Sequence, residues 1–161
     1  TDPNHNIDLT AMAREFALAY KRDKARAKEA GTKARALPGV HHPIFKGKPE
    51  NFDPRERFIA KFMQERGAYN IFHQFSRELV RQLYDLGASR YVFCVNVDAI
   101  IAALLLAGLW KDYHAGRMTD ANLETAAFTI FLFGRMIGAA AEIDDHLNRG
   151  IPARPRRSAG M

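Results

Sequence analysis

The chain has 161 residues, of which 47% are hydrophobic, so it is long enough to bury a core as one domain or as part of a larger one. Its single cysteine, Cys94, excludes an intrachain disulfide and suits a reducing compartment, and we see no secretory signal, so we expect a cytoplasmic protein. The net charge of +6 would suit a nucleic acid, a membrane surface or a small polyanion, but residues 21–33 and 154–157 carry much of it, as solvated ends commonly do, and no nucleic-acid-binding signature is present.

The first predicted helix covers residues 8–30, where apolar side chains recur at steps of three and four before Gly31. The next passage, residues 37–57, reads LPGVHHPIFKGKPENFDPRER and contains the adjacent pair His41 and His42. Adjacent histidines are poorly spaced as metal ligands, and no cysteine or second histidine pair lies near, so we expect no metal site. The two histidines are either exposed bystanders or part of a loop that brings an imidazole close to a ligand.

Two amphipathic helices are predicted after this loop. Asp53 and Pro54 form an N-cap followed by proline at the first helical position, which predicts a helix over residues 54–66. Apolar residues at helical spacing predict another over residues 69–86. His73, between aromatic residues of that helix, is interpreted as a structural histidine, and Cys94 as a small buried hydrophobic residue.

Residues 89–98, SRYVFCVNVD, are rich in β-branched and aromatic side chains and are predicted to be extended. Asn96 or Asp98 would then cap an apolar helix over residues 99–110. Its run of twelve apolar residues is too short to span a bilayer, so we interpret it as a buried helix and expect no membrane association.

A link over residues 108–118 is expected to lead to a long helix that begins at Thr119 or Asp120 and runs to about Asn148. Gly150, with two prolines after it, predicts an extended tail. Since no second strand is convincing, the pattern predicts an all-α fold.

Arg135 and Asp98 are isolated charges in apolar surroundings. Arg135 is the only charged residue in residues 128–141, so it needs either a structural ion pair, for example with Asp98 or Glu142, or an anionic ligand such as a carboxylate. Asp98 is explained either as the N-cap of the apolar helix or as a general base in an apolar pocket.

Four motifs in order resemble those of the citrate synthase superfamily, and the resemblance covers nearly the whole chain. They are PGVHHPIFK followed by FDPR, NVDAI opening the apolar helix, LFGRMIG, and IPARPRR at the C-terminus. The segments NVDAIIA and FLFGRMIG are more similar to the branch that includes the citryl-CoA-cleaving domain of ATP-citrate lyase than to other branches of the family. The resemblance implies an all-helical homodimer. Residues 1–103 would form the small domain, and residues 104–161 the C-terminal segment of the large domain with an extended arm.

The resemblance also implies a reaction: condensation of acetyl-CoA, or a similar acyl-CoA, with oxaloacetate or a related 2-oxo acid. Asp98 matches the base that removes a proton from the acetyl methyl group. His42 matches the histidine that hydrogen-bonds the oxaloacetate carbonyl and donates a proton to it. No cofactor would be bound permanently, since the coenzyme A thioester is a co-substrate. Cleavage of citryl-CoA would use the same residues in the opposite direction, and a non-catalytic fragment or partner subunit is a further alternative.

The remaining site residues implied by the resemblance are basic. Arg55, Arg135 and Arg154 match arginines that bind substrate carboxylates, and Arg154 matches one that reaches into the site of the neighbouring subunit. Lys46 matches a basic position near the phosphates of coenzyme A. Arginine forks suit a ligand with several carboxylates.

Three features depart from the family pattern. The segment with the histidine that polarises the acetyl-CoA carbonyl, together with the N-terminal part of the large domain, would precede Thr1. Glu142 stands where relatives often have histidine, and the loop between His42 and Arg55 is longer than usual.

Overall fold

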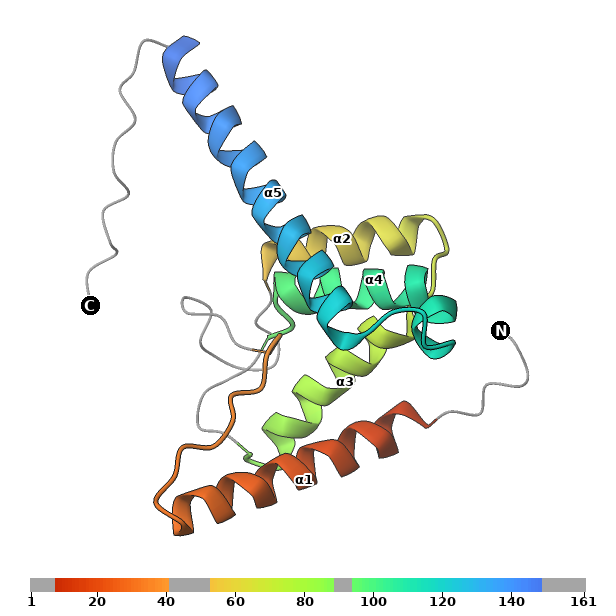
Figure 1. The fold of residues 1–161 in the computed structure, drawn as a ribbon, viewed down its shortest axis with the longest axis vertical. Coiled ribbons are helices and arrows are strands. Elements are labelled where there is room, and N and C mark those ends of the chain that lie inside the picture. Colours follow the sequence, from red (N-terminus) through yellow and green to blue (C-terminus); the bar gives the residue numbers. More distant parts are fainter. Residues whose placement is uncertain (1–7, 41–52, 89–93, 149–161) are drawn as a thin grey trace.

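The computed structural model describes residues 8–40, 53–88 and 94–148, which form five α-helices and, within these ranges, no strand (Figure 1). The helices are α1 (Leu9–Glu29), α2 (Pro54–Glu65), α3 (Ile71–Asp85), α4 (Val97–His114) and α5 (Asp120–Asn148). The all-α prediction is therefore confirmed. The division into two domains stays a prediction, and its boundary at Ala103 lies inside α4.

The helix ends follow the predicted start and stop signals. The Thr119 hydroxyl, a predicted cap, accepts a hydrogen bond from the Asn122 amide at 3.3 Å. The N-cap of α1, which the sequence analysis did not name, is Asp8, which accepts from the Ala11 amide at 2.9 Å. Asp53 caps α2, with Pro54 at its first position as predicted. α3 begins two residues later than predicted, because Asn70 accepts hydrogen bonds from the Phe72 and His73 amides and is its N-cap.

The sequence interpretation of α4 was wrong in three respects. Val97 and Asp98 are already helical, so the predicted extended stretch does not reach Asp98, and residues 89–93 of it lie outside the described residues. The helix also continues through the predicted link to His114, since one internal glycine costs only about 1 kcal/mol and aromatic packing holds the last turns. Finally, α4 is only partly buried: Ile100 and Ala103 are covered, whereas Leu104 and Trp110 are exposed.

The core lies where α1 packs across α3. Ala13 and Ala17 of α1 have no solvent exposure, which lets the two helices approach closely. They meet Leu79, Val80 and Leu83 of α3, with Val40, Ala88 and Val95 from the connecting segments at the edge of the cluster. Burial of this apolar surface stabilises the fold by about 25 cal/mol per Å².

Part of the basic run at residues 21–33 has a structural role that the sequence did not suggest. The Lys21 Nζ atom donates to the Leu86 carbonyl at 2.7 Å, and the Lys24 Nζ atom donates to the Ala88 carbonyl at 3.0 Å. Carbonyls at the C-terminus of a helix lack partners and carry partial negative charge, which lysine satisfies. These two lysines therefore join α1 to the end of α3.

Helix α3 is tied to α4 at both a polar and an aromatic contact. The Asn70 side-chain nitrogen donates to the Ala103 carbonyl at 3.0 Å, and the rings of Phe72 and Trp110 lie with centroids 5.3 Å apart. Helix α2 also packs against α4. The middle of the molecule is thus α4, with α3 and α2 against it.

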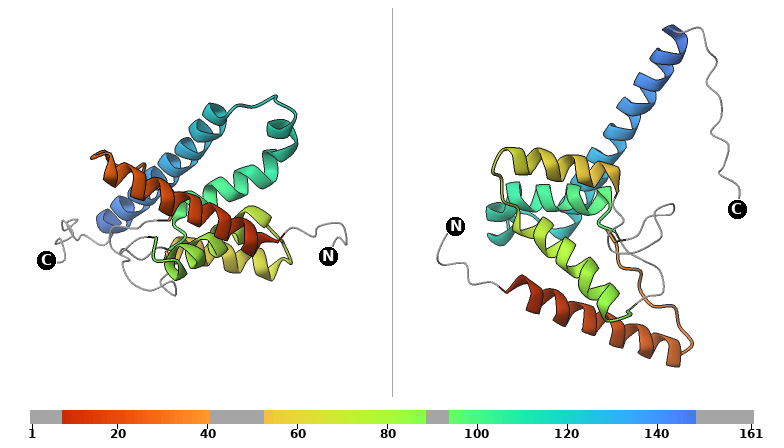
Figure 2. Two further views of the ribbon diagram at one scale, coloured as in Figure 1. Left: turned by 90° about the horizontal axis from the view of Figure 1, so that it is seen from below. Right: turned by 180° about the vertical axis from the view of Figure 1, so that it is seen from behind.

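Helix α5 packs on α4 through its first half and then projects beyond the other helices (Figures 1 and 2). None of its residues is buried, and its exposed apolar side chains include Phe128, Phe133, Met136 and Ile137. By length and composition it is the one helix in the described part of the chain that is long and apolar enough to cross a membrane. A helix that is covered by a protein partner has the same composition.

Candidate functional site

The candidate site lies at the N-terminus of α4, and Asn96 forms that end. Its side-chain oxygen accepts hydrogen bonds from the Asp98 amide at 3.0 Å and the Ala99 amide at 3.1 Å. Asn96 rather than Asp98 is therefore the N-cap, and the capping explanation for Asp98 was wrong. Asp98 lies in the first turn, where the helix dipole favours a carboxylate, and its side chain is exposed.

Asp53 connects the start of α2 to the start of α4. It is fully buried, and its Oδ2 atom accepts a hydrogen bond from the Val97 amide at 3.1 Å. Its Oδ1 atom also accepts from the Arg55 amide at 3.0 Å, as an N-cap does. One carboxylate thus serves the first turns of two helices.

Arg55 is held by the same carboxylate. Its Nε atom donates to Asp53 Oδ1 at 2.9 Å and its Nη2 atom donates to Asp53 Oδ2 at 2.6 Å, a two-pronged arrangement that fixes the plane of the guanidinium. Burial by itself would raise the pKa of Asp53, but the hydrogen bonds and charge of Arg55, with the Val97 amide, outweigh burial and lower it. The hydrogen bond and charge of Asp53 raise the pKa of Arg55, and the negative charge of Asp98 contributes to the same shift.

The loop that carries the predicted histidine enters this region from the other side. The Gly39 carbonyl accepts a hydrogen bond from the Asn96 amide at 2.9 Å, and Val40 is buried. A Cβ atom at Gly39 would lie 2.9 Å from the Ala99 Cβ atom, so the backbone needs a glycine to approach α4 this closely. Gly39 and Asp53, which lie before and after residues 41–52, are therefore both bonded to the first turn of α4.

Three of the predicted site residues fall in segments that the structure does not describe. His42 and Lys46 lie within residues 41–52, and Arg154 lies within residues 149–161. His41 also lies in the first of these segments. Their predicted roles stay predictions.

Arg135 is not brought to the α4 N-terminus by any interaction among the described residues. It is exposed on α5, with its guanidinium carbon 5.4 Å from the centre of the Phe131 ring, and no acidic side chain of the described ranges pairs with it. The ion pair with Asp98 or Glu142 that the sequence suggested is absent from this part of the chain. Because α5 is uncovered, the apolar surroundings that the sequence implied for Arg135 are here open to solvent.

Two further titratable groups lie beneath the site. His73 is buried, and its Nε2 atom lies 2.6 Å from Glu56 Oε1, which confirms the structural interpretation of this histidine. Cys94 is buried as predicted, and burial raises the pKa of its thiol, with the charges of Asp53 and Glu56 adding to the shift and Arg55 opposing it. Within the described ranges, no group of three potential metal-ligating side chains lies close enough to hold an ion.

Sequence reasoning missed the central role of Asp53 and a basic cavity between α2 and α3. The only sequence signal for Asp53 was its capping position, which does not reveal a bond to a helix 44 residues away. The basic cavity has a signal that was available: Arg57 and Lys61 on α2, and Arg77 and Arg81 on α3, are each separated by four residues.

Comparison with known proteins found no matching family model, no matching curated protein and no matching solved structure.

Proposed function

We propose that this chain carries catalytic residues of an enzyme of the citrate synthase type, which joins an acyl-CoA to oxaloacetate or a related 2-oxo acid. The observation that carries the proposal concerns the residues on either side of the segment that contains His42. Gly39 bonds to Asn96, and Asp53 bonds to Val97, both at the N-terminus of the helix whose first turn contains Asp98. An imidazole, a carboxylate and a guanidinium on these segments are the groups that the condensation needs.

In the proposed reaction, the Asp98 carboxylate removes a proton from the methyl carbon of the thioester. The resulting enolate carbon attacks the keto carbon of the 2-oxo acid, and His42 donates a proton to the keto oxygen as the carbon–carbon bond forms. Water then hydrolyses the citryl thioester and releases coenzyme A. In the cleavage direction, the same groups would return citryl-CoA to acetyl-CoA and oxaloacetate.

The basic residues would bind and orient the substrates. Asp53 fixes the fork of Arg55 beside Asp98, and a fixed guanidinium is suited to holding a substrate carboxylate with two hydrogen bonds. Arg135, Arg154 of a second copy, and Lys46 would contact the remaining carboxylates and the coenzyme A phosphates. The proposal requires that the thioester and the second subunit cover Asp98 and Arg135 during turnover, since both are exposed in the single chain.

The test is a pair of assays on the natural full-length protein: release of free coenzyme A from acetyl-CoA plus oxaloacetate, and breakdown of citryl-CoA. We expect turnover in one or both assays, and Asp98→Asn to lower kcat by about 10² to 10⁴. Asp85→Asn, an exposed acid at the end of α3, is the matched control and should leave kcat unchanged. Failure of the natural protein in both assays would refute the proposal.

A non-catalytic partner subunit is the second candidate, and the uncovered α5 favours it because this helix can complete another chain. Its distinguishing result is coenzyme A release that requires a second, different polypeptide and that survives Asp98→Asn.

A further inference from the structure

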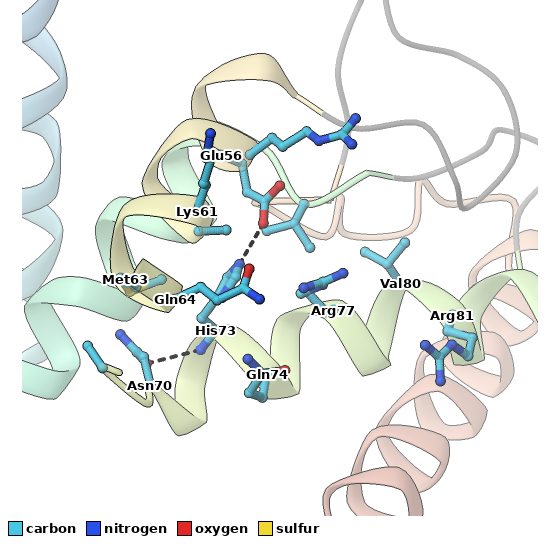
Figure 3. A pocket seen from close by; sticks show the side chains of 14 residues that line it. Glu56, Lys61, Met63, Gln64, Asn70, His73, Gln74, Arg77, Val80 and Arg81 are labelled. Carbon is cyan, nitrogen blue, oxygen red and sulfur yellow. Dashed lines mark hydrogen bonds and ion pairs between the residues drawn. The ribbon is translucent and has the colours of Figure 1, made fainter. Parts of the chain in front are cut away.

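A separate cavity of about 900 Å³ lies between α2 and α3 (Figure 3). Glu56 and His73 form one part of its wall, and Arg77 extends from α3 into the space that faces α2. The volume is at the upper end of the range, about 300 to 1,000 Å³, that small-molecule sites occupy. It is therefore large enough for a ligand of nucleotide size.

The charged side chains of this cavity are mostly positive. Arg57 and Lys61 come from successive turns of α2, and Arg77 and Arg81 come from successive turns of α3. Glu56 is the one carboxylate in the wall, and it is already bonded to His73 at 2.6 Å. Four cationic side chains thus line one cavity, and like charges in one cavity repel one another where no anion offsets them.

Of these cations, Lys61 and Arg81 each have an acid nearby. Lys61 lies 3.8 Å from Glu65, with both side chains more than half exposed, and Arg81 lies 3.1 Å from Glu78. Because solvent screens the exposed pair of Lys61 and Glu65, that pair contributes little, and an anionic ligand can compete for Lys61. Arg77 lines the cavity and forms no ion pair with an acidic residue of the described ranges.

We propose that the α2–α3 cavity binds a small, multiply phosphorylated molecule through Lys61 and Arg77. Phosphate groups carry up to two charges each, so a di- or triphosphate can satisfy several cations from one position, and arginine and lysine are the residues that bind it. The polar groups of Gln64 and Gln74, also in the wall, supply further hydrogen-bonding partners. Asp98 and Arg55 are not among the residues that line the cavity, and binding there does not depend on the proposed reaction.

The experiment is isothermal titration calorimetry of the full chain with inorganic triphosphate, ATP and citrate as probes, at two salt concentrations. We expect saturable binding of triphosphate and ATP that weakens with salt, and weaker binding of citrate. Because a charge-assisted hydrogen bond contributes about 1.5 to 3 kcal/mol, Arg77→Gln should weaken triphosphate binding by roughly 10- to 100-fold. Arg22→Gln, which removes the same charge from the exposed face of α1, should change it less than about twofold.

Thermal unfolding of each variant serves as the folding control, and Lys61→Gln provides a second, independent reduction of affinity. A nucleoside contribution would appear as tighter binding of ATP than of triphosphate, and equal affinities would assign recognition to the phosphates alone; both support the proposal. Equal loss in Arg77→Gln and Arg22→Gln, equal affinity for citrate, or no saturable binding would overturn it. Each of these results can be obtained whether or not the protein has condensing or cleaving activity.

Discussion

At the residue scale, Asp53 is the side chain on which the candidate site depends. Its two oxygens receive the Arg55 guanidinium, the Arg55 amide and the Val97 amide, and the carboxylate is fully buried. A buried carboxylate is costly unless it is paired and hydrogen-bonded, and here both conditions are met. Removing its charge would leave the donors without an adequate acceptor.

We predict that Asp53→Asn lowers the free energy of unfolding at pH 7 by about 2 to 3 kcal/mol, because hydrogen bonds to a charged acceptor are lost and an amide N–H₂ faces other donors. Solvent screening at Arg55, whose side chain is 47% exposed, reduces the contribution of the ion pair itself. The check is urea unfolding of both proteins. Asp23→Asn, an exposed partner of Arg26 on α1, is the control and should change stability by less than about 0.5 kcal/mol.

The same variant gives a pH dependence with a definite sign. The pKa of Asp53 is below 3.8 in the folded protein, so its stabilisation is fully present above the ordinary carboxylate pKa and is lost as pH falls through the lower, folded value. The stability difference between the natural protein and Asp53→Asn should therefore be constant from pH 7 to about pH 5 and shrink below about pH 4. A difference that does not change down to pH 3 would contradict the assigned bonding.

At the scale of elements, two segments distant in sequence meet the first turn of α4. Capping by Asn96 leaves its own amide available to the Gly39 carbonyl, and Asp53 takes the next amide, Val97. The first amides of a helix have no partner within the helix, so external acceptors at this end stabilise both the helix and whatever carries them. The N-terminus of α4 thereby fixes the positions of Gly39 and Asp53, which lie on either side of residues 41–52.

We predict that Gly39→Ala lowers the free energy of unfolding by about 2 to 4 kcal/mol, from the strain of a positive φ and from overpacking against Ala99. Gly31→Ala is a matched control: its φ of 66° is also positive, but a Cβ atom there meets nothing within 4 Å. It should cost only the backbone strain, about 1 to 2 kcal/mol. If chemical denaturation gave the same loss of unfolding free energy for Gly39→Ala and Gly31→Ala, the close approach of Gly39 to α4 would be contradicted.

At the scale of the whole molecule, α5 is the element whose environment is incomplete. Its 29 residues span about 43 Å, against about 27 Å for α4, so one helix cannot cover the other along its length. Large apolar side chains remain exposed along the projecting part, among them Phe133, Met136 and Ile137. Arg135 lies near the middle of the helix. At the centre of a membrane-spanning helix, an arginine raises the free energy of insertion by about 2.5 to 3.5 kcal/mol. We therefore expect a protein partner, rather than a bilayer, to cover this helix.

The resemblance implies a homodimer, and we expect the second copy to cover α5, so that Ile137→Glu should convert the expected dimer to a monomer. Light scattering after gel filtration measures the mass of each species, and Phe58→Glu, at an exposed apolar position on α2, should remain dimeric. Flotation with lipid vesicles tests the alternative, in which a bilayer covers α5. A monomer at every concentration, or migration of the natural protein with the vesicles, would contradict this assignment.

Several features could be predicted from the sequence because they depend on neighbours in the chain. Helical spacing, the cap Asp53 and the stop glycines predicted the all-α class and the ends of α1 and α2 to within one residue. The structural role of His73 and the burial of Cys94 were also predicted, the latter because a free cysteine commonly behaves as a small buried hydrophobic residue. The end of α4 was not, because its last turns are held by packing against Phe72 of α3.

Local pattern determined which residues are helical and which charges stand alone, since periodicity and capping act within a few residues. Only the tertiary structure decided what those charges meet. It bonded Asp53 to Val97, docked Gly39 on α4, and left Arg135 in solvent where the sequence implied enclosure. Hydrogen bonds and burial between segments depend on how helices pack, and that information is not contained in the spacing of residues along any one of them.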